Sequence, residues 1–201
     1  MTVMADAGVV AARLRALQRG AGTVLVGIDG LGGSGKSHLA AILVAAMARP
    51  DDPTVSLVHG DDFFLPSAER LAGDAAAKPI GADVDWRRLR VDVLEPLRAG
   101  RAARYRPYDW DRDVLGAWQA VKPGGMVVVE GVYTLRPELR AFYGVRIWVE
   151  CPREMRLARG LARDGEAARG RWEDDWMPAE DRYVAECRPA EGVDYVVSGA
   201  A

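Results

Sequence analysis

The chain of 201 residues contains no asparagine, only three lysines and only two cysteines. Without asparagine it can have neither the catalytic-loop asparagine of protein kinases nor the asparagine of the guanine-reading motif of GTPases. Two cysteines, Cys151 and Cys187, are too few for a disulfide framework. The formal net charge of -2 gives no sign of a nucleic-acid-binding surface.

Long apolar runs are also missing, since no stretch approaches the eighteen apolar residues of a membrane span. The first twenty residues carry arginines and an acid where a secretory signal would need an unbroken apolar run. The length favours one domain over residues 1–201. We therefore expect a cytoplasmic protein that does not bind membranes or nucleic acid, and we leave open whether it is a homo-oligomer.

Runs of β-branched and apolar residues alternate with helical patterns along the chain. This alternation predicts a three-layer α/β/α fold with a parallel sheet of about five strands. The predicted strands lie within 23–29, 54–64, 124–132, 144–152 and 193–199. The predicted helices are an N-terminal helix within 1–20 and helices at 36–48, 85–97, 153–164 and 179–187.

The segment GIDGLGGSGKSHLA, residues 27–40, fits two phosphate-binding motifs, the dinucleotide motif G-x-G-x-x-G and the triphosphate motif G-x-x-x-x-G-K-S. A dinucleotide fold needs an acidic residue at the end of the second strand, whereas Asp51 and Asp52 precede that strand. A triphosphate loop needs the lysine and the serine that follow the last glycine. We therefore predict an ATP site formed by Gly30, Gly32, Gly33, Ser34, Gly35, Lys36, Ser37 and His38.

Carboxylates also stand at the ends of two further strands, where ligands gather in α/β sheets. Asp61 and Asp62 leave the second strand, and adjacent strand residues face opposite sides, so one of the pair is expected to face the site. An aspartate there could accept the proton of an attacking hydroxyl, although a turn or capping role is the alternative. Glu130 ends an apolar strand, which favours a role at Mg²⁺ with Ser37 over a plain salt bridge.

Four arginines recur on one side of the helix predicted at 153–164: Arg153, Arg156, Arg159 and Arg163. They could form a solvated face or, in a lid over about 152–176, close on the triphosphate and exclude water. The acidic, tryptophan-rich segment 171–178 receives no chemical role from its sequence, and we expect it to be a hinge or to pack the lid.

These motifs together resemble the uridine kinase and phosphoribulokinase family of P-loop kinases from about residue 22 to 199. The resemblance implies an ATP- and Mg²⁺-dependent kinase acting on a hydroxyl of a small metabolite, with Lys36 and Asp61 as catalytic residues. It places Glu130 at the metal and Arg159 and Arg163 at ATP. The implied acceptor residues are Asp62, Phe64, Tyr108, Arg171 and either Asp83 or Asp85.

Two positions depart from the uridine kinase pattern. Gly160 stands where those enzymes tend to have a second consecutive arginine, and Asp113 stands where they can have a base-reading histidine. We expect a ribonucleoside acceptor such as uridine or cytidine, with nicotinamide riboside or pantothenate as alternatives. A regulatory NTPase without a small acceptor is the competing hypothesis from another class.

Overall fold

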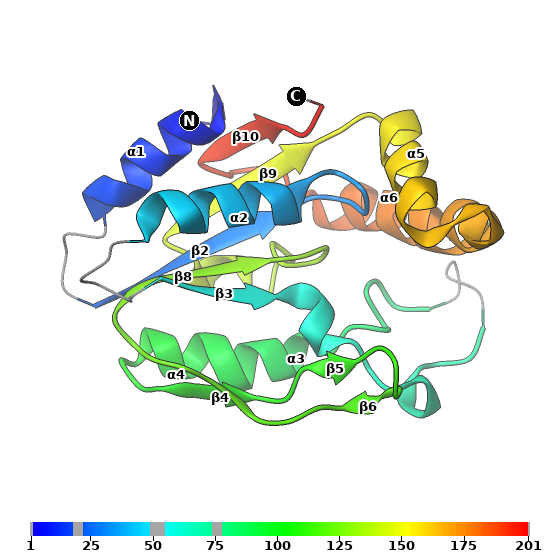
Figure 1. The fold of residues 1–201 in the computed structure, drawn as a ribbon, viewed down its shortest axis with the longest axis horizontal. Helices are drawn as coiled ribbons and strands as arrows, with labels where there is room; N and C mark the ends of the chain where they lie inside the picture. The colour runs from blue at the N-terminus through cyan, green and yellow to red at the C-terminus, as the bar shows by residue number, and fades with distance from the viewer. Residues whose placement is uncertain (1, 18–21, 49–54, 74–77, 201) are drawn as a thin grey trace.

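The computed structural model describes residues 2–17, 22–48, 55–73 and 78–200. Six strands form one sheet in the order β1-β10-β9-β2-β8-β3, and every neighbouring pair is parallel (Figure 1). These strands are β1 Val3–Ala5, β2 Thr23–Asp29, β3 Val55–His59, β8 Gly125–Glu130, β9 Val145–Glu150 and β10 Tyr195–Ser198. The sheet confirms the predicted α/β class.

Helices cover both faces of the sheet, which gives the predicted three layers (Figure 1). In β8, Met126 and Val128 pack into the core under α1 and α2, whereas Val127 and Val129 pack into the core on the opposite face. Such alternation buries both faces of a parallel strand. The helices are α1 Ala7–Leu17, α2 Lys36–Met47, α3 Trp86–Leu89, α4 Glu95–Arg98, α5 Arg153–Asp164 and α6 Met177–Cys187.

The N-terminal segment differs from the prediction of one helix within 1–20 and adds the sixth strand. Residues Val3–Ala5 form the edge strand β1, and α1 begins only at Ala7. Asp6 separates the two elements, because its Oδ1 accepts the backbone N–H of Val9 at 2.9 Å and thereby caps the helix. A strand of three residues is too short to show an alternating pattern in the sequence.

Two helical stretches contain a π-helical segment, which has a wider turn, shortly before a proline. The helix predicted at 85–97 is formed by α3, a π-helical segment at Arg90–Leu94 and α4. A second π-helical segment, Arg171–Trp176, leads into α6. Pro96 and Pro178 each follow such a segment by two residues, and a proline cannot donate to the carbonyl four residues earlier and clashes with it. A wider turn relieves that clash.

Two short antiparallel pairs, absent from the prediction, lie outside the six-stranded sheet. β4 (Ala103–Tyr105) pairs with β7 (Gln119–Val121), and β5 (Tyr108–Asp109) pairs with β6 (Val114–Leu115). Within the described part of the chain, no helix has the length and apolar character needed to cross a membrane. Asp51 and Asp52, used above to weigh the dinucleotide motif, lie outside the described residues.

Candidate active site

The glycine loop joins β2 to α2 at the carboxyl edge of the sheet. Gly33 and Gly35 have φ angles of 74° and 92°, in the region that favours glycine. A Cβ atom on Gly33 would lie 2.4 Å from the carbonyl oxygen of Arg156, so the backbone of α5 lies directly against the loop. Lys36 and Ser37 then open α2. A glycine-dependent turn that feeds a helix N-terminus is the arrangement that binds phosphate groups.

Ser37 and Glu130 meet beside this helix N-terminus. Ser37 Oγ donates to Glu130 Oε2 at 3.0 Å, and His59 Nδ1 lies 2.7 Å from Glu130 Oε1. Burial raises the pKa of Glu130, but the His59 hydrogen bond and the charge of Lys36 outweigh it and hold the pKa below its usual value. The same hydrogen bond raises the pKa of His59. Sequence reasoning missed His59, although it ends the strand just before Asp61.

The donor set fits Mg²⁺. A serine hydroxyl and a carboxylate supply hard oxygen ligands, and Mg²⁺ is usually held by one or two carboxylates together with substrate phosphates and water. Glu130 is only 3% exposed, and its two carboxylate oxygens are held by the hydrogen bonds to Ser37 and His59. Ser37 and Glu130 are therefore the residues that would hold the ion next to a phosphate bound by Lys36.

Two pockets open on either side of the loop. The edge pocket lies between the loop, α5 and the β10–β1 edge of the sheet. The central pocket lies between the loop, the segment 60–64, the segment 78–84 and the helix at 172–180. Three residues line both pockets: Gly33, Lys36 and Arg163. A group bound at Lys36 is therefore accessible from both sides.

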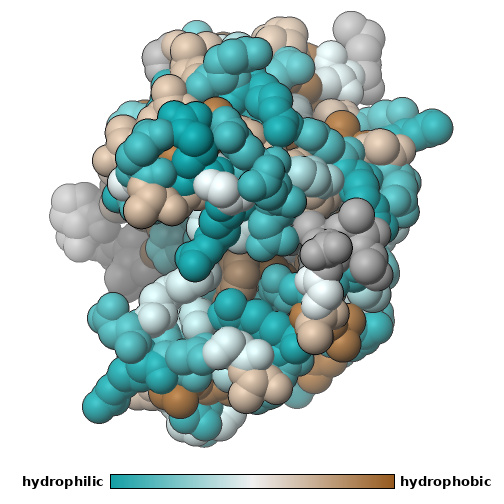
Figure 2. All heavy atoms as spheres, turned by 90° about the vertical axis from the view of Figure 1, so that its right-hand side faces the viewer, coloured by the Kyte–Doolittle hydropathy of each residue, from teal (hydrophilic) through white to brown (hydrophobic). Residues whose placement is uncertain are grey.

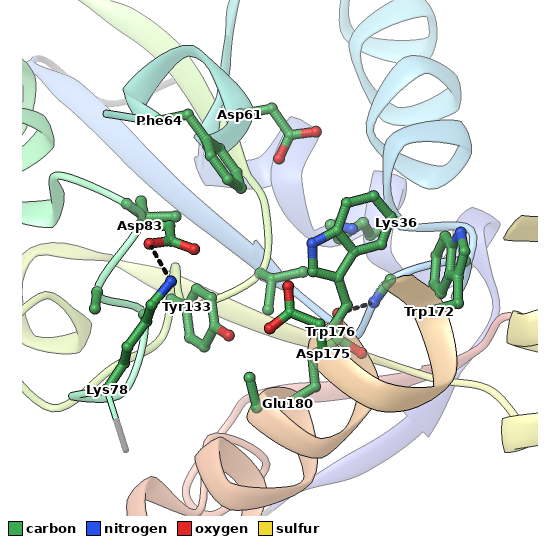
Figure 3. A pocket seen from close by; sticks show the side chains of 18 of the residues that line it. Lys36, Asp61, Phe64, Lys78, Asp83, Tyr133, Trp172, Asp175, Trp176 and Glu180 are labelled. Carbon is green, nitrogen blue, oxygen red and sulfur yellow. Dashed lines mark hydrogen bonds and ion pairs between the residues drawn. The ribbon is translucent and has the colours of Figure 1, made fainter. Parts of the chain in front are cut away.

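Figure 2 shows the face of the molecule onto which these elements open, hollowed near its centre, with hydrophilic residues around a hydrophobic floor. The close-up in Figure 3 shows side chains from several elements lining the central pocket. The labelled residues are Lys36, Asp61, Phe64, Lys78, Asp83, Tyr133, Trp172, Asp175, Trp176 and Glu180.

The two adjacent aspartates have different surroundings. Asp61 lines the central pocket (Figure 3). Asp62 does not, and its Oδ2 accepts the hydroxyl of Tyr105 at 3.0 Å. Burial raises the pKa of Asp62, although the Tyr105 hydrogen bond opposes this. Only Asp61 of the pair therefore lines the pocket, and its role as the base stays a prediction.

The carboxylates of Asp83 and Asp85 also have different surroundings. Asp83 lines the central pocket, where its Oδ1 lies 3.4 Å from Lys78 Nζ. Asp85 lies outside the lining and caps α3 by accepting the backbone N–H of Arg88 at 3.0 Å. The carboxylate of Asp85 is thus engaged in capping the helix, whereas Asp83 faces the pocket.

Two further predicted acceptor residues lie outside the pocket lining. Tyr108 Oη donates to Asp113 at 2.6 Å and accepts from Arg70 at 2.9 Å, so this network holds it behind the wall. Arg171 stacks on Trp176, with its guanidinium carbon 5.6 Å from the ring centroid. The aromatic side chains that do line the pocket are Phe64, Trp110, Tyr133, Trp172 and Trp176, and Phe64 is the one among them that the sequence analysis above gives as an acceptor residue.

The arginines of α5 do not share one environment. Arg156 is 3% exposed and donates to Glu180 Oε2 at 2.9 Å, so the solvated face does not include it. Glu180 Oε1 also accepts the loop N–H of Gly32 at 2.8 Å. Arg159 donates to the carbonyl of Gly199 at 2.6 Å in the edge pocket.

Trp172 belongs to the segment 171–178, which has no chemical role assigned from its sequence, and its side chain is buried. It is 1% exposed, and a Cβ atom on Gly160 would lie 2.4 Å from its ring. The indole Nε1 donates to Asp164 at 3.0 Å. Trp172 therefore packs α5 against the phosphate loop.

A parallel sheet, a G-x-x-x-x-G-K-S loop and two pockets that meet at its lysine define a P-loop kinase of small molecules. The model of the phosphoribulokinase/uridine kinase family matches residues 25–179, and the chain belongs to that family. The family resemblance, the fold class and the ATP-dependent small-molecule kinase activity predicted from the sequence are thereby confirmed.

Three similar proteins illustrate the relationship. Uridine kinase from Staphylococcus aureus (strain JH9) is 27% identical over 174 residues, which cover 83% of this chain and 79% of the relative. A possible uridine kinase from Bacillus stearothermophilus superposes with a TM-score of 0.70 at 24% identity, over 94% of this chain and 98% of the other. A proposed fructose transport system kinase from Silicibacter sp. TM1040 gives 0.75 at 24% identity, over 96% and 99%. Both solved structures share the fold.

Proposed function

We propose that this kinase transfers the γ-phosphoryl group of ATP to the 5'-hydroxyl of a ribonucleoside, with uridine or cytidine as the first candidates. The observation that carries the proposal is the meeting of the edge and central pockets at Lys36, with Asp61 on the central side. ATP in the edge pocket would present its γ-phosphoryl group to an acceptor in the central pocket. The uridine kinases among the relatives support the acceptor class.

The residues at the junction have distinct tasks in this proposal. Asp61 accepts the proton of the attacking hydroxyl, which is a general-base step. Lys36 and Arg163 neutralise charge on the phosphoryl group as it moves. Mg²⁺ held by Ser37 and Glu130 would supply further charge neutralisation on the phosphates. The side chains that line the two pockets around Lys36 exclude water, which would otherwise hydrolyse ATP.

The central pocket also suits the two ends of a nucleoside. Asp83 offers a carboxylate to the vicinal hydroxyls of a ribose. Phe64, Trp110, Tyr133 and Trp176 offer aromatic faces, and stacking on such faces contributes about 1 kcal/mol beyond the area buried. A planar base therefore has a wall to stack on and the ribose has a hydrogen-bond acceptor.

Nicotinamide riboside is a second candidate because of the charge in the same pocket. Asp175 joins Asp61 and Asp83 in the lining, and a cationic ring is attracted both by carboxylates and by aromatic faces. Two nearby acids lie outside the lining of this pocket and already have partners. Asp113 accepts from Ser67 and Tyr108, and Asp109 accepts backbone N–H groups of its own turn.

The test is a coupled kinase assay over uridine, cytidine, nicotinamide riboside, pantothenate and fructose, with the matched variants Asp61→Asn and Asp62→Asn. We expect Asp61→Asn to lower kcat by at least about 100-fold without changing the Kd for ATP, because loss of a general base removes about 10²–10⁴-fold in rate. Asp62→Asn is expected to retain most activity, since an amide oxygen can still accept from Tyr105.

Three outcomes would contradict the proposal. If Asp62→Asn is inactive while Asp61→Asn turns over normally, the base has been misassigned. If pantothenate or fructose alone stimulates turnover, the nucleoside class is wrong. ATP hydrolysis that is rapid without acceptor and indifferent to the whole panel would instead favour a regulatory NTPase.

A further inference from the structure

The N-terminal element forms a wall of the edge pocket although it lies outside the matched family region. The family match begins at residue 25, whereas Ala5, Asp6 and Ala7 line this pocket together with the loop residues. They stand at the carboxyl end of β1 and the start of α1. This wall is therefore supplied by a part of the chain to which neither the loop motif nor the family match assigns a role.

The sheet order fixes how far this wall lies from the phosphates. Three strand steps separate β2, which carries the phosphate loop, from β1: β2 to β9, β9 to β10 and β10 to β1. At about 4.8 Å a step, the β1 end lies roughly 14 Å across the sheet from the loop. An extended nucleoside triphosphate can bridge such a span. In the placement of ATP proposed above, on which this inference rests, the γ-phosphoryl group lies at the junction with the central pocket and the base would reach the β1 end.

The far end of the edge pocket suits a planar base with a hydrogen-bonding edge. Ile42 is 41% exposed on α2 and lines the pocket, as does Val197, which pairs with Ala5 of β1, so apolar surface is available there. Asp6 follows Ala5, which pairs with Val197, so its carboxylate stands at the level of Ser198 across the two strands. A flat ring held between apolar side chains would present its edge to these polar groups.

The two carboxylate oxygens of Asp6 differ in their hydrogen bonds. Its Oδ1 accepts the N–H of Val9, which caps α1. Its Oδ2 has no hydrogen-bond partner among the residues that the structure describes. A carboxylate accepts hydrogen bonds and cannot donate them, so Oδ2 distinguishes an amino group from a carbonyl group on the base.

We propose that Asp6 is a specificity residue for the phosphate donor, and that its Oδ2 accepts a hydrogen bond from the 6-amino group of adenine. ATP then satisfies the carboxylate. ITP, which carries a carbonyl oxygen at the same position, places two acceptors against each other. Rejection of the wrong functional group at a site built to bind the right one is stronger than rejection by shape alone.

The test is equilibrium titration of the 201-residue chain with ATP and with ITP in the presence of Mg²⁺, which needs no acceptor. We expect the wild type to bind ATP at least about tenfold more tightly than ITP, equivalent to about 1.4 kcal/mol. Asp6→Ser keeps a helix cap but is too short to reach the base. It should bind ATP about tenfold more weakly, whereas ITP binding should not weaken, because the carboxylate that opposes the carbonyl of ITP is gone.

Asp6→Asn adds an independent signature. Its amide oxygen can still accept from adenine, while its N–H group can donate to the carbonyl of ITP, so ITP binding should improve and ATP binding should change little. Equal affinities of the wild type for ATP and ITP would overturn the proposal. So would tighter binding of GTP than ATP, or an equal loss of both affinities in Asp6→Ser, which indicates damage to α1. Failure of the nucleoside proposal, by contrast, would appear only in the acceptor assay.

Discussion

Asp29 is a buried carboxylate directly beneath the phosphate loop, and it makes the stability of this protein depend on pH. It ends β2 with 0% exposure and accepts the N–H groups of Gly30 and Leu135, each at 2.7 Å. It also accepts the hydroxyl of Tyr183 at 2.6 Å. Burial raises its pKa from 3.8 to about 6, although these hydrogen bonds and the charge of Lys36 act in the opposite direction.

The direction of the pH effect follows from the raised pKa. Between pH 4 and 6 the folded protein holds a proton on Asp29 that the unfolded chain has released. The free energy of unfolding therefore falls as pH rises through this window. The difference between 3.8 and about 6 corresponds to a total of about 3 kcal/mol at 1.36 kcal/mol per pKa unit. Roughly half of this change, about 1.4 kcal/mol, falls between pH 5 and pH 8.

Urea unfolding of the wild type and of Asp29→Asn at several values between pH 5 and pH 8 measures this effect. Asparagine does not titrate, so the stability of the wild type relative to the variant should increase by about 1.4 kcal/mol from pH 8 to pH 5. The exposed Asp111→Asn serves as the control for loss of a carboxylate as such. A difference between wild type and Asp29→Asn that stays constant across the range would refute the reasoning.

Two further predictions concern the lid. Gly160→Ala should lower the free energy of unfolding by about 1–3 kcal/mol in urea titrations, because its Cβ would lie 2.4 Å from Trp172. In the matched change Gly170→Ala the new Cβ would lie 3.6 Å from Asp174 Oδ2, an ordinary contact, and should have little effect, so equal losses would count against the packing explanation. Glu180→Ala should destabilise by about 3–5 kcal/mol because it leaves Arg156 buried without its partner. In a thermal unfolding series, Arg156→Met/Glu180→Met should recover stability relative to Glu180→Ala, and a double variant no better than that single one would contradict this.

The sheet and the phosphate end of the site could be predicted from the sequence because their signals are local. β-branched runs mark buried strands, and the glycine loop has fixed spacing between a strand and a helix. β1 was missed because three residues are too few to show a period, yet Asp6 before an apolar helical pattern is a capping signal that could have placed the start of α1.

The lining of the central pocket was predicted less well because tertiary contacts decide it. The sequence places Asp83 and Asp85 two residues apart, but only the fold shows that Asp85 caps α3 while Asp83 faces the pocket. Tyr133 and Trp176 lie more than forty residues apart in the chain and both line this pocket. No spacing rule connects such positions, since the loops that carry them are placed by packing.

Trp172 shows how a segment without a chemical motif can still shape the site. Its indole ring lies against two glycines, one in the phosphate loop and one in the lid, because a Cβ atom on either Gly32 or Gly160 would approach the ring to 3.0 Å or 2.4 Å. An arginine at position 160 and this buried tryptophan are therefore incompatible. Glycine at position 160 thus permits a close apolar contact between α5 and the phosphate loop. Arg163, which lines both pockets, lies beside the same tryptophan, with its guanidinium carbon 5.8 Å from the ring centroid.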